Sequence, residues 1–201
     1  GEKKRLAAGE VIRKTLSDII KPRYDAVTNG QEMVTEDILS SLLKVIDADT
    51  NKRFSFEEIL DQVAMLFLAG HETTASSLTW TLYILSMTPE CQEKVYEEIQ
   101  EIAKNEAFTI HHIRKMKYLT NVFKESLRLY PPVGFFARES KEETTIRKKL
   151  IKKGAGIVVA PWLIHRHEDF WENPHEFDPS RHEDKGNIQK GTYLPFGMGE
   201  R

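Results

Sequence analysis

The chain has 201 residues, of which 40% are hydrophobic and 30% charged, and a formal net charge of −2. This is the composition of an ordinary globular protein, and the charge gives no general attraction to nucleic acid or acidic membranes. The only cysteine, Cys91, excludes an internal disulfide and a cysteine-based zinc cluster, so a reducing, cytoplasmic location is expected. The polar opening shows no signal peptide, and whether a membrane anchor precedes it is left open.

Hydrophobic spacing predicts a largely helical first part of the chain. Apolar residues recur at helical intervals in the segments 6–24, 35–46, 55–87, 89–103 and 118–130. The longest segment opens on Ser55 and Glu58, the residue types of a capping box. Because it is apolar on most sides, it is expected to be surrounded by protein at the centre of the fold.

The later part of the chain changes character. Segments 144–151 and 156–164 are rich in β-branched residues and predict two short strands joined by a glycine-containing turn at 154–156. Residues 167–201 are rich in Pro, Gly, Asn and Asp and predict ordered loop. The expected fold class is therefore mainly α with a small β part, organised as one domain over residues 1–201.

The strongest local motif is AGHETT at residues 69–74, inside the long predicted helix. Gly70 costs about 1 kcal/mol relative to alanine at mid-helix, and it lets a flat ligand approach the backbone. Thr73 can bond back to the preceding turn and loosen the helix, and Glu72 places an acid beside that hydroxyl. An acid next to a hydroxyl suits proton delivery to a bound reactant. The alternative is a buried helix with small residues for close packing.

Three further motifs follow in the chain. Glu125 and Arg128, three residues apart, lie on one helix face and can form a pair. A Phe-Asp-Pro-Ser-Arg segment ends at Arg181, and a tight Pro-Phe-Gly-Met-Gly-Glu-Arg loop runs from Pro195 to Arg201. Arg201 is suited to binding a carboxylate.

In their order and separation, these four motifs resemble the cytochrome P450 family over nearly the whole chain. The resemblance implies a partial cytochrome P450 fold, in which the acid-Thr-Thr element lies on a long central helix over the haem. It assigns Glu72 and Thr73 to proton delivery toward bound dioxygen. It also assigns Glu125, Arg128 and Arg181 to a buried charge network that fixes the fold, which survives burial only if every member is paired.

The resemblance extends to the cofactor and the substrate. It implies haem b, electrons from NAD(P)H through a reductase or a ferredoxin or flavodoxin partner, dioxygen, and a small apolar organic substrate that is hydroxylated or epoxidised. The residues it assigns to the haem are Gly70, Arg138, Phe196, Gly199 and Arg201. Those it assigns to the substrate pocket are Val133, Phe135 and Phe136.

Two local departures from the family pattern stand out. The segment that usually ends in Glu-Arg-Phe reads Ser180, Arg181 and His182 here. The turn between the two predicted strands, which normally carries Gly and then Pro, has basic residues at 147–149 and 152. These departures affect the expected geometry of the hairpin and leave the family resemblance intact.

Other functions remain open at the sequence level. A haem-thiolate isomerase or a peroxygenase is a related alternative, although the acid-threonine pair favours oxygen activation. A helical calcium-binding or interaction module is an alternative of another class, because residues 47–58 follow a calcium-loop pattern that ends at Glu58. Lys52 replaces the glycine that this loop requires. His165 and His167 are expected to be surface residues more than a metal pair.

The resemblance predicts that the iron ligand, a cysteine, falls two residues after Arg201, so that the chain is an internal fragment ending just before it. Thiolate ligation favours O–O cleavage, and the 201-residue chain expressed alone is expected to bind haem poorly and to be inactive. Reading the second codon beyond Arg201 tests the first expectation. Purified chain with stoichiometric haem and a thiolate-type carbon monoxide spectrum would contradict the second.

Overall fold

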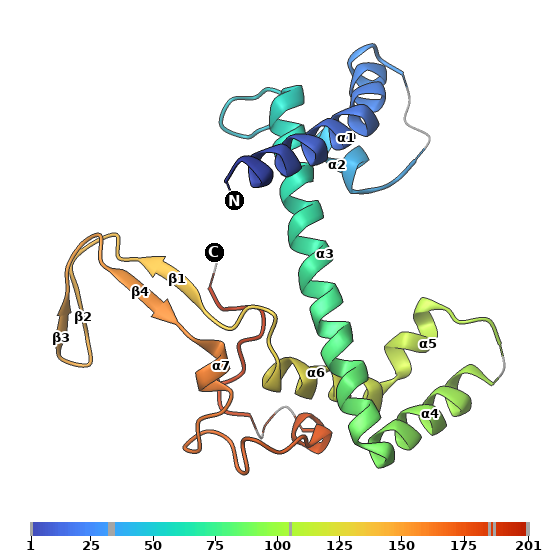
Figure 1. The fold of residues 1–201 in the computed structure, drawn as a ribbon, viewed down its shortest axis with the longest axis vertical. Helices are drawn as coiled ribbons and strands as arrows, with labels where there is room; N and C mark the ends of the chain where they lie inside the picture. Colours follow the sequence, from blue (N-terminus) through green and yellow to red (C-terminus); the bar gives the residue numbers. More distant parts are fainter. Residues whose placement is uncertain (1, 32–34, 105, 185, 187, 200–201) are drawn as a thin grey trace. The chain divides into compact units, whose positions relative to one another are not determined.

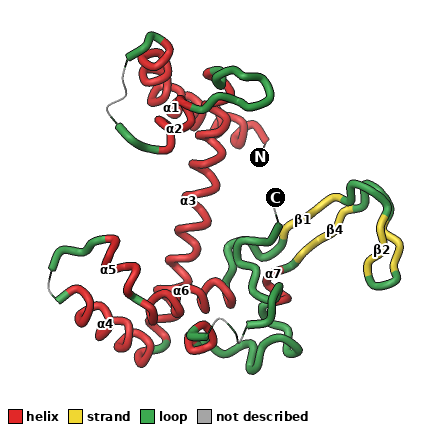
Figure 2. The backbone as a smooth tube through the Cα atoms, turned by 180° about the vertical axis from the view of Figure 1, so that it is seen from behind, coloured by secondary structure: helices red, strands yellow, loops and turns green. Residues whose placement is uncertain are grey.

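The computed structural model describes residues 2–31, 35–104, 106–184, 186 and 188–199. The chain divides into two compact units, Gly1–Glu72 and Thr73–Arg201, and the boundary falls inside helix α3 (Phe56–Met87). Helices predominate, and the strands belong to the second unit (Figure 2). No helix among the described residues is both long and apolar enough to cross a bilayer.

The first unit is built from helices α1 (Glu2–Thr28) and α2 (Ile38–Lys44) and the beginning of α3 (Figure 1). Its core is a cluster of four buried aliphatic residues, one from α1, one from α2 and two from α3: Ile20, Leu43, Ile59 and Leu60. On the exposed side, Arg13 of α1 pairs with Asp61 at 2.6 Å and with Glu57. Apolar burial and ion pairing therefore join the three helices.

Two side-chain caps explain where helices begin. Asp37 accepts a hydrogen bond from the Ser40 N–H at 2.8 Å, so α2 begins after residue 37 and not at 35 as predicted. Hydrogen bonds from Arg23 and then from the Ser40 N–H hold the pKa of Asp37 well below its usual range. At α3, Glu58 accepts from the N–H and hydroxyl of Ser55, both at 2.7 Å, which confirms the predicted capping box.

In the second unit, helices α4 (Pro89–Ala103), α5 (Ile110–Lys115) and α6 (Lys117–Leu129) follow the end of α3. The segments predicted at 89–103 and 118–130 match α4 and α6 to within one residue. Helix α4 packs on α6 (Figure 1). Glu98 of α4 accepts from the Tyr118 and Leu119 N–H groups at 2.8 and 2.9 Å, satisfying two donors that have no partner within α6.

The β part differs from the two short strands predicted at 144–151 and 156–164. Residues 144–151 form a small antiparallel hairpin, β2 (Thr144–Ile146) and β3 (Lys149–Ile151), because Arg147 and Lys148 adopt left-handed φ angles of 46° and 64° and turn the chain. Strand β4 (Gly156–Val159) pairs instead with β1 (Phe136–Glu139), which the sequence reading missed. The β2–β3 hairpin is inserted between these two strands.

The predicted second strand also ends early. Residues Pro161–Ile164 form the short helix α7, which begins at the proline because the missing proline N–H costs nothing in a first turn. The predicted loop at 167–201 contains one short 3-10 helix, η1 (Pro179–His182). Most of the remaining described tail is loop, as predicted.

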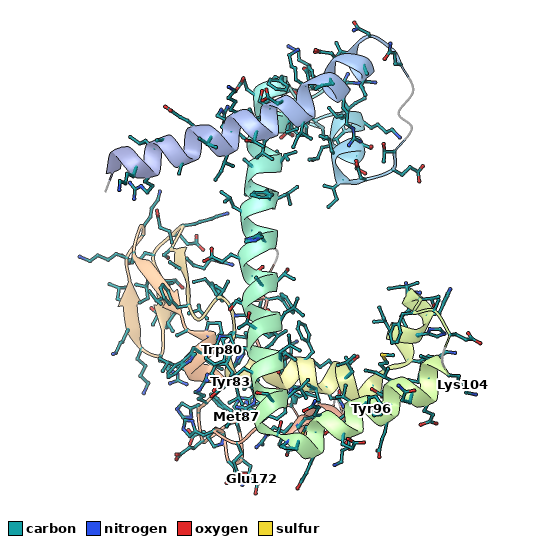
Figure 3. The ribbon with its side chains drawn as sticks, turned by 45° about the vertical axis from the view of Figure 1, so that its right-hand side comes forward. Trp80, Tyr83, Met87, Tyr96, Lys104 and Glu172 are labelled. Atoms are coloured by element: carbon teal, nitrogen blue, oxygen red, sulfur yellow. The ribbon has the colours of Figure 1, made fainter. Side chains whose placement is uncertain are left out.

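An aromatic stack links α3 to α7 within the second unit. Trp80 lies on the C-terminal half of α3 together with Tyr83 and Met87 (Figure 3), and its ring stacks on Tyr130 with centroids 4.0 Å apart and 6° between planes. The Arg166 guanidinium lies 5.7 Å from the Tyr130 ring centroid and 4.4 Å from that of Trp162 in α7. Tyr130, which follows the last residue of α6, is therefore held between Trp80 of α3 and the Arg166 guanidinium, and Arg166 in turn contacts Trp162 of α7.

The core of the first unit predicts the effect of truncating Ile59, which is 1% exposed. Ile59→Ala removes three buried carbons and leaves a cavity, so the free energy of unfolding should fall by about 2–5 kcal/mol. Ile38→Ala is the control, because Ile38 is 67% exposed and its loss should change that free energy by less than about 0.5 kcal/mol. Urea denaturation followed by circular dichroism measures both; equal losses would contradict the assigned core.

Candidate functional site

Arg128, on α6, is fully buried and has every N–H group paired. Its Nε and one Nη2 hydrogen donate to the two carboxylate oxygens of Glu125, at 2.9 and 2.7 Å. The other three hydrogens go to main-chain carbonyls of the tail, those of His165, Pro174 and Glu176, at 2.7, 2.7 and 2.9 Å. A guanidinium has five such donors, so the side chain is saturated. The Trp171 ring also lies 5.0 Å from its central carbon.

Glu125 is the acidic partner at the centre of this network and has no exposed surface. Besides Arg128, it accepts from the Asp178 N–H at 3.1 Å and contacts His182 Nε2 at 3.0 Å. Arg181 Nε lies 3.4 Å from the carboxylate, an ion pair without hydrogen-bond geometry. Burial by itself raises the pKa of Glu125, but the hydrogen bonds from His182 and Arg128 outweigh burial and hold this pKa below its ordinary value.

The structure therefore brings together Glu125 and Arg128 from one motif and Arg181 from another. It adds His182, which the sequence reading recorded only as a departure from the usual pattern. The segment with Asp178 and Arg181 reaches Glu125 because η1 begins at Pro179 and packs against α6. A charged residue three positions before Arg128 was readable from the sequence, whereas the histidine contact depends on this packing.

His165 corrects an expectation, because it is 0% exposed and not a surface residue. Its Nδ1 lies 3.1 Å from the Arg128 carbonyl, and its Nε2 accepts from the Leu194 N–H at 2.7 Å. These two partners assign a neutral ring with the proton on Nδ1. The imidazole thus joins the end of α6 to the residue before the Pro195–Phe196 loop. Burial is the main cause that lowers its pKa to about 4.

An apolar cavity of about 350 Å³ lies beside this network, entirely within the second unit. One wall comes from α3 and α6 and the other from the two proline-containing loops after α6 and before residue 197. Its lining residues are Thr73, Thr74, Ser77, Leu78, Phe123, Leu127, Pro132, Val133, Pro195 and Phe196. Three predicted site residues, Thr73, Val133 and Phe196, meet there.

A second cavity of about 340 Å³ adjoins the first and shares Val133, Pro195 and Phe196 with it. It also brings in Phe136 and Arg138 of β1, both expected near a ligand. Gly197, at a φ of 75°, adopts the left-handed conformation that allows its loop to turn there.

Other predicted residues are placed differently. Phe135 is 71% exposed and lines neither cavity. Gly70 and Glu72 belong to the first unit, and a Cβ at Gly70 would meet no atom within 4 Å. Gly199 has a φ of 98°, and Arg201 lies outside the described residues. Helix α3 is continuous from Phe56 to Met87, and the loosening of the helix at Thr73 stays a prediction.

In the segment that follows a calcium-loop pattern, residues 47–58, the side chains of Asp47 and Glu58 accept hydrogen bonds from neighbouring residues. Asp47 Oδ1 accepts from the Asp49 and Thr50 N–H groups at 2.8 and 2.9 Å, and Glu58 caps α3 through Ser55. In the described ranges, no group of three or more His, Cys, Asp or Glu side chains could hold a metal ion. The structure therefore provides no metal site for the calcium alternative among these residues.

Comparison with known proteins agrees with this geometry. Residues 2–201 match the family model for cytochrome P450. The chain is 35% identical to cyclooctatin synthase of Streptomyces melanosporofaciens over 188 residues, which is 92% of this chain and 41% of that protein. It is 36% identical to cytochrome P450 4V2 of Homo sapiens over 167 residues, 81% of this chain and 32% of that protein. The chain belongs to the cytochrome P450 family.

A solved structure supports the same assignment. The crystal structure of the cytochrome P450DA heme domain superposes with a TM-score of 0.87 at 28% identity, over 98% of this chain and 43% of that one. The chain spans about a third to two fifths of the length of the curated relatives described above. The mostly helical fold with a small sheet is thereby confirmed.

The residues around the two cavities fit a haem. The shared wall is apolar, as a flat macrocycle requires, and Phe196, 87% exposed on the Pro195–Gly197 loop, presents a ring to such a ligand. Arg138 lines the second cavity and forms no ion pair with any described residue, so its charge is available to an acidic edge group. Cys91 lies in the first turn of α4 and is not among the residues that line either cavity.

His165 predicts a pH dependence of stability. Its ring stays neutral in the folded state, whereas an unfolded histidine binds a proton near pH 6.5. As the pH falls from about 6.5 to about 4, His165 therefore binds a proton in the unfolded state but not in the folded state. The free energy of unfolding falls by up to about 3 kcal/mol over this range.

His165→Gln should reduce this loss, because an amide keeps one donor and one acceptor and does not titrate. His167→Gln is the matched control, since His167 is largely exposed. Urea unfolding at a series of pH values measures the slope of stability against pH. An unchanged slope in the His165 variant would contradict the neutral, bridging ring.

Proposed function

We propose that the protein containing this chain is a haem-thiolate monooxygenase that acts on a small apolar organic substrate. The observation that supports this most directly is the apolar cavity where Thr73 of α3 faces the Pro195–Phe196 loop. Membership in the cytochrome P450 family supplies the reaction class. Hydroxylation or epoxidation would be the outcome for such a substrate.

The lining of the cavities supports an apolar ligand more than a polar one. Leu78, Phe123 and Val133 offer apolar surface and no side-chain hydrogen bond. An apolar molecule is therefore bound by surface burial, while the few hydroxyls from α3 act on its position or on a proton.

Arg138, Phe196 and Gly199 are the residues proposed to hold haem b. Arg138 would bind an acidic edge group by a charge-assisted hydrogen bond, and the Pro195–Gly197 loop would pack against one face of the ring. When bound, the haem supplies an iron at which dioxygen is activated with two electrons. Those electrons are proposed to come from NAD(P)H through a reductase, ferredoxin or flavodoxin partner.

Thr73 is the residue proposed to deliver a proton, with Glu72, its neighbour in α3, as the acidic source. Thr73 is half-buried and lines the cavity, so its hydroxyl can act on a ligand there. A hydroxyl can accept one proton while it donates another, which lets it relay charge without becoming charged itself. The Glu72 carboxyl group would take up a proton from water and pass it to the Thr73 hydroxyl.

A haem-thiolate isomerase or a peroxygenase would use the same fold. Neither needs a proton relay to dioxygen to the same degree, so the presence of Thr73 in the cavity favours oxygen activation. A calcium-binding function would not explain the buried Glu125 network or the Phe196 loop.

The relay predicts that Thr73→Ala uncouples oxygen consumption from product formation in the full-length protein. The ratio of product formed to dioxygen consumed should fall by roughly 10-fold or more, because the proton-transfer step loses its donor. Thr73→Ser is the matched control and should stay near the parent, since it keeps the hydroxyl. Oxygen uptake, peroxide release and product are measured together with a surrogate reductase. Unchanged coupling in the alanine variant would refute the role of Thr73.

A further inference from the structure

His182 occupies the position at which the corresponding family segment usually carries phenylalanine. It is 5% exposed, and its Nε2 lies 3.0 Å from Oε2 of Glu125. We propose that His182 is a positioning residue: its Nε2–H completes the hydrogen bonding of the buried Glu125 carboxylate, which in turn orients Arg128. The proposal concerns this chain's own network and does not depend on the monooxygenase assignment.

The hydrogen bonds to Glu125 show why a donor matters at this position. Oε1 accepts from Arg128 Nη2 at 2.7 Å and from the Asp178 N–H at 3.1 Å. Oε2 accepts from Arg128 Nε at 2.9 Å and from His182 Nε2 at 3.0 Å. An ionised carboxylate has about four acceptor sites, so His182 fills the last of them.

The other cation near Glu125 at this end, Arg181, does not make this hydrogen bond. Arg181 Nε is 3.4 Å from Oε1, on the other oxygen, and lacks hydrogen-bond geometry. Phenylalanine at position 182 would therefore leave one acceptor site of a fully buried carboxylate without a donor. An unsatisfied buried acceptor is costly, and more so when it is charged.

The same imidazole also contacts the loop that lines the cavities. Its ring centroid lies 5.1 Å from that of Tyr193, and Tyr193 stacks on His165 at 5.5 Å. The Tyr193 hydroxyl donates to the Lys124 carbonyl at 2.9 Å. His182 thus has two separable properties, an aromatic ring that packs on Tyr193 and an N–H that pairs with Glu125.

These two properties can be tested separately because different substitutions keep each one. His182→Phe keeps an aromatic ring and loses the donor. His182→Gln loses the ring and keeps an N–H that can reach the carboxylate. Packing alone predicts that Phe resembles the parent and Gln does not, whereas a positioning hydrogen bond predicts the reverse.

Acid unfolding gives the most specific measurement, because it reports on Glu125. The pKa of Glu125 is held below its ordinary value, so its contribution to stability is complete above the unfolded pKa, near 4.5, and is lost as the pH falls through the lower folded pKa. Removing one donor raises the folded pKa and moves this loss to higher pH. The ionisable groups around the pair are Arg128, Arg181, Asp178, Glu183, Tyr193, Lys124, Lys117, Tyr118, Arg114, Glu98 and His165.

The experiment compares the full-length parent, His182→Phe and His182→Gln by circular dichroism and tryptophan fluorescence between pH 8 and pH 3. The acid midpoint of the Phe variant should lie roughly 0.5–1 pH unit above the parent, and that of the Gln variant should lie between the two. The thermal midpoint at pH 7.5 should follow the same order, with the Phe variant lower by several degrees.

The order of the two variants decides the proposal. A Gln variant that resists acid better than the Phe variant supports the hydrogen bond, and so does a Phe variant that fails to fold where Gln folds. A Phe variant equal to or more resistant than Gln shows that the ring alone matters and overturns the proposal. Because none of these readouts involves oxygen or product, its failure is distinguishable from failure of the monooxygenase assignment.

Discussion

The second unit depends on one buried ion pair, Glu125 with Arg128. Neither charge can be buried alone, because each would lose its hydration without replacement. Arg128 has three N–H groups left after pairing, and these bind carbonyls at residues 165, 174 and 176. The loop-rich tail therefore folds back on α6. Its main-chain carbonyls accept the hydrogen bonds that the buried Arg128 guanidinium would otherwise donate to water. The irregular backbone of the tail is ordered because the Arg128 side chain, on α6, donates hydrogen bonds to three of its carbonyl groups.

This constraint also sets the position of the cavities. His165 bonds the Arg128 carbonyl on one side and the Leu194 N–H on the other, so the Pro195–Phe196 loop starts at a fixed distance from α6. Apolar residues of α3 and α6 then complete the wall against that loop. The buried hydrogen-bond network around Arg128 and His165 thus fixes the position of the Pro195–Phe196 loop relative to α6. The apolar side chains of α3 and α6 line the cavity. A ligand that needs both an apolar surface and a cation at its edge is suited to this division, with Arg138 as the cation.

The helices were predictable because their causes are local. The Ser55–Glu58 capping box, the proline at the start of α4 and the prolines after α6 each act within a few residues, and the observed helices follow them closely. The strands were not predictable to the same degree. A run of β-branched residues at 144–151 indicates extended backbone, but the turn at Arg147 and Lys148 lacks the glycine or asparagine that usually marks such a hairpin. The partner of β4 is β1, and strand pairing over some twenty residues is a non-local choice.

The sequence by itself determined the family, the long helices and the identities of the charged residues, since these follow from motifs and from spacing along the chain. Only the tertiary structure decided which groups meet. It placed His165 in the interior, although a histidine beside Arg166 and His167 indicates a surface residue, because the Arg128 carbonyl and the Leu194 N–H together satisfy both ring nitrogens. It also made His182 a partner of Glu125, 57 positions away. Hydrogen bonding of buried groups is settled by distances in space, which no pattern along the chain records.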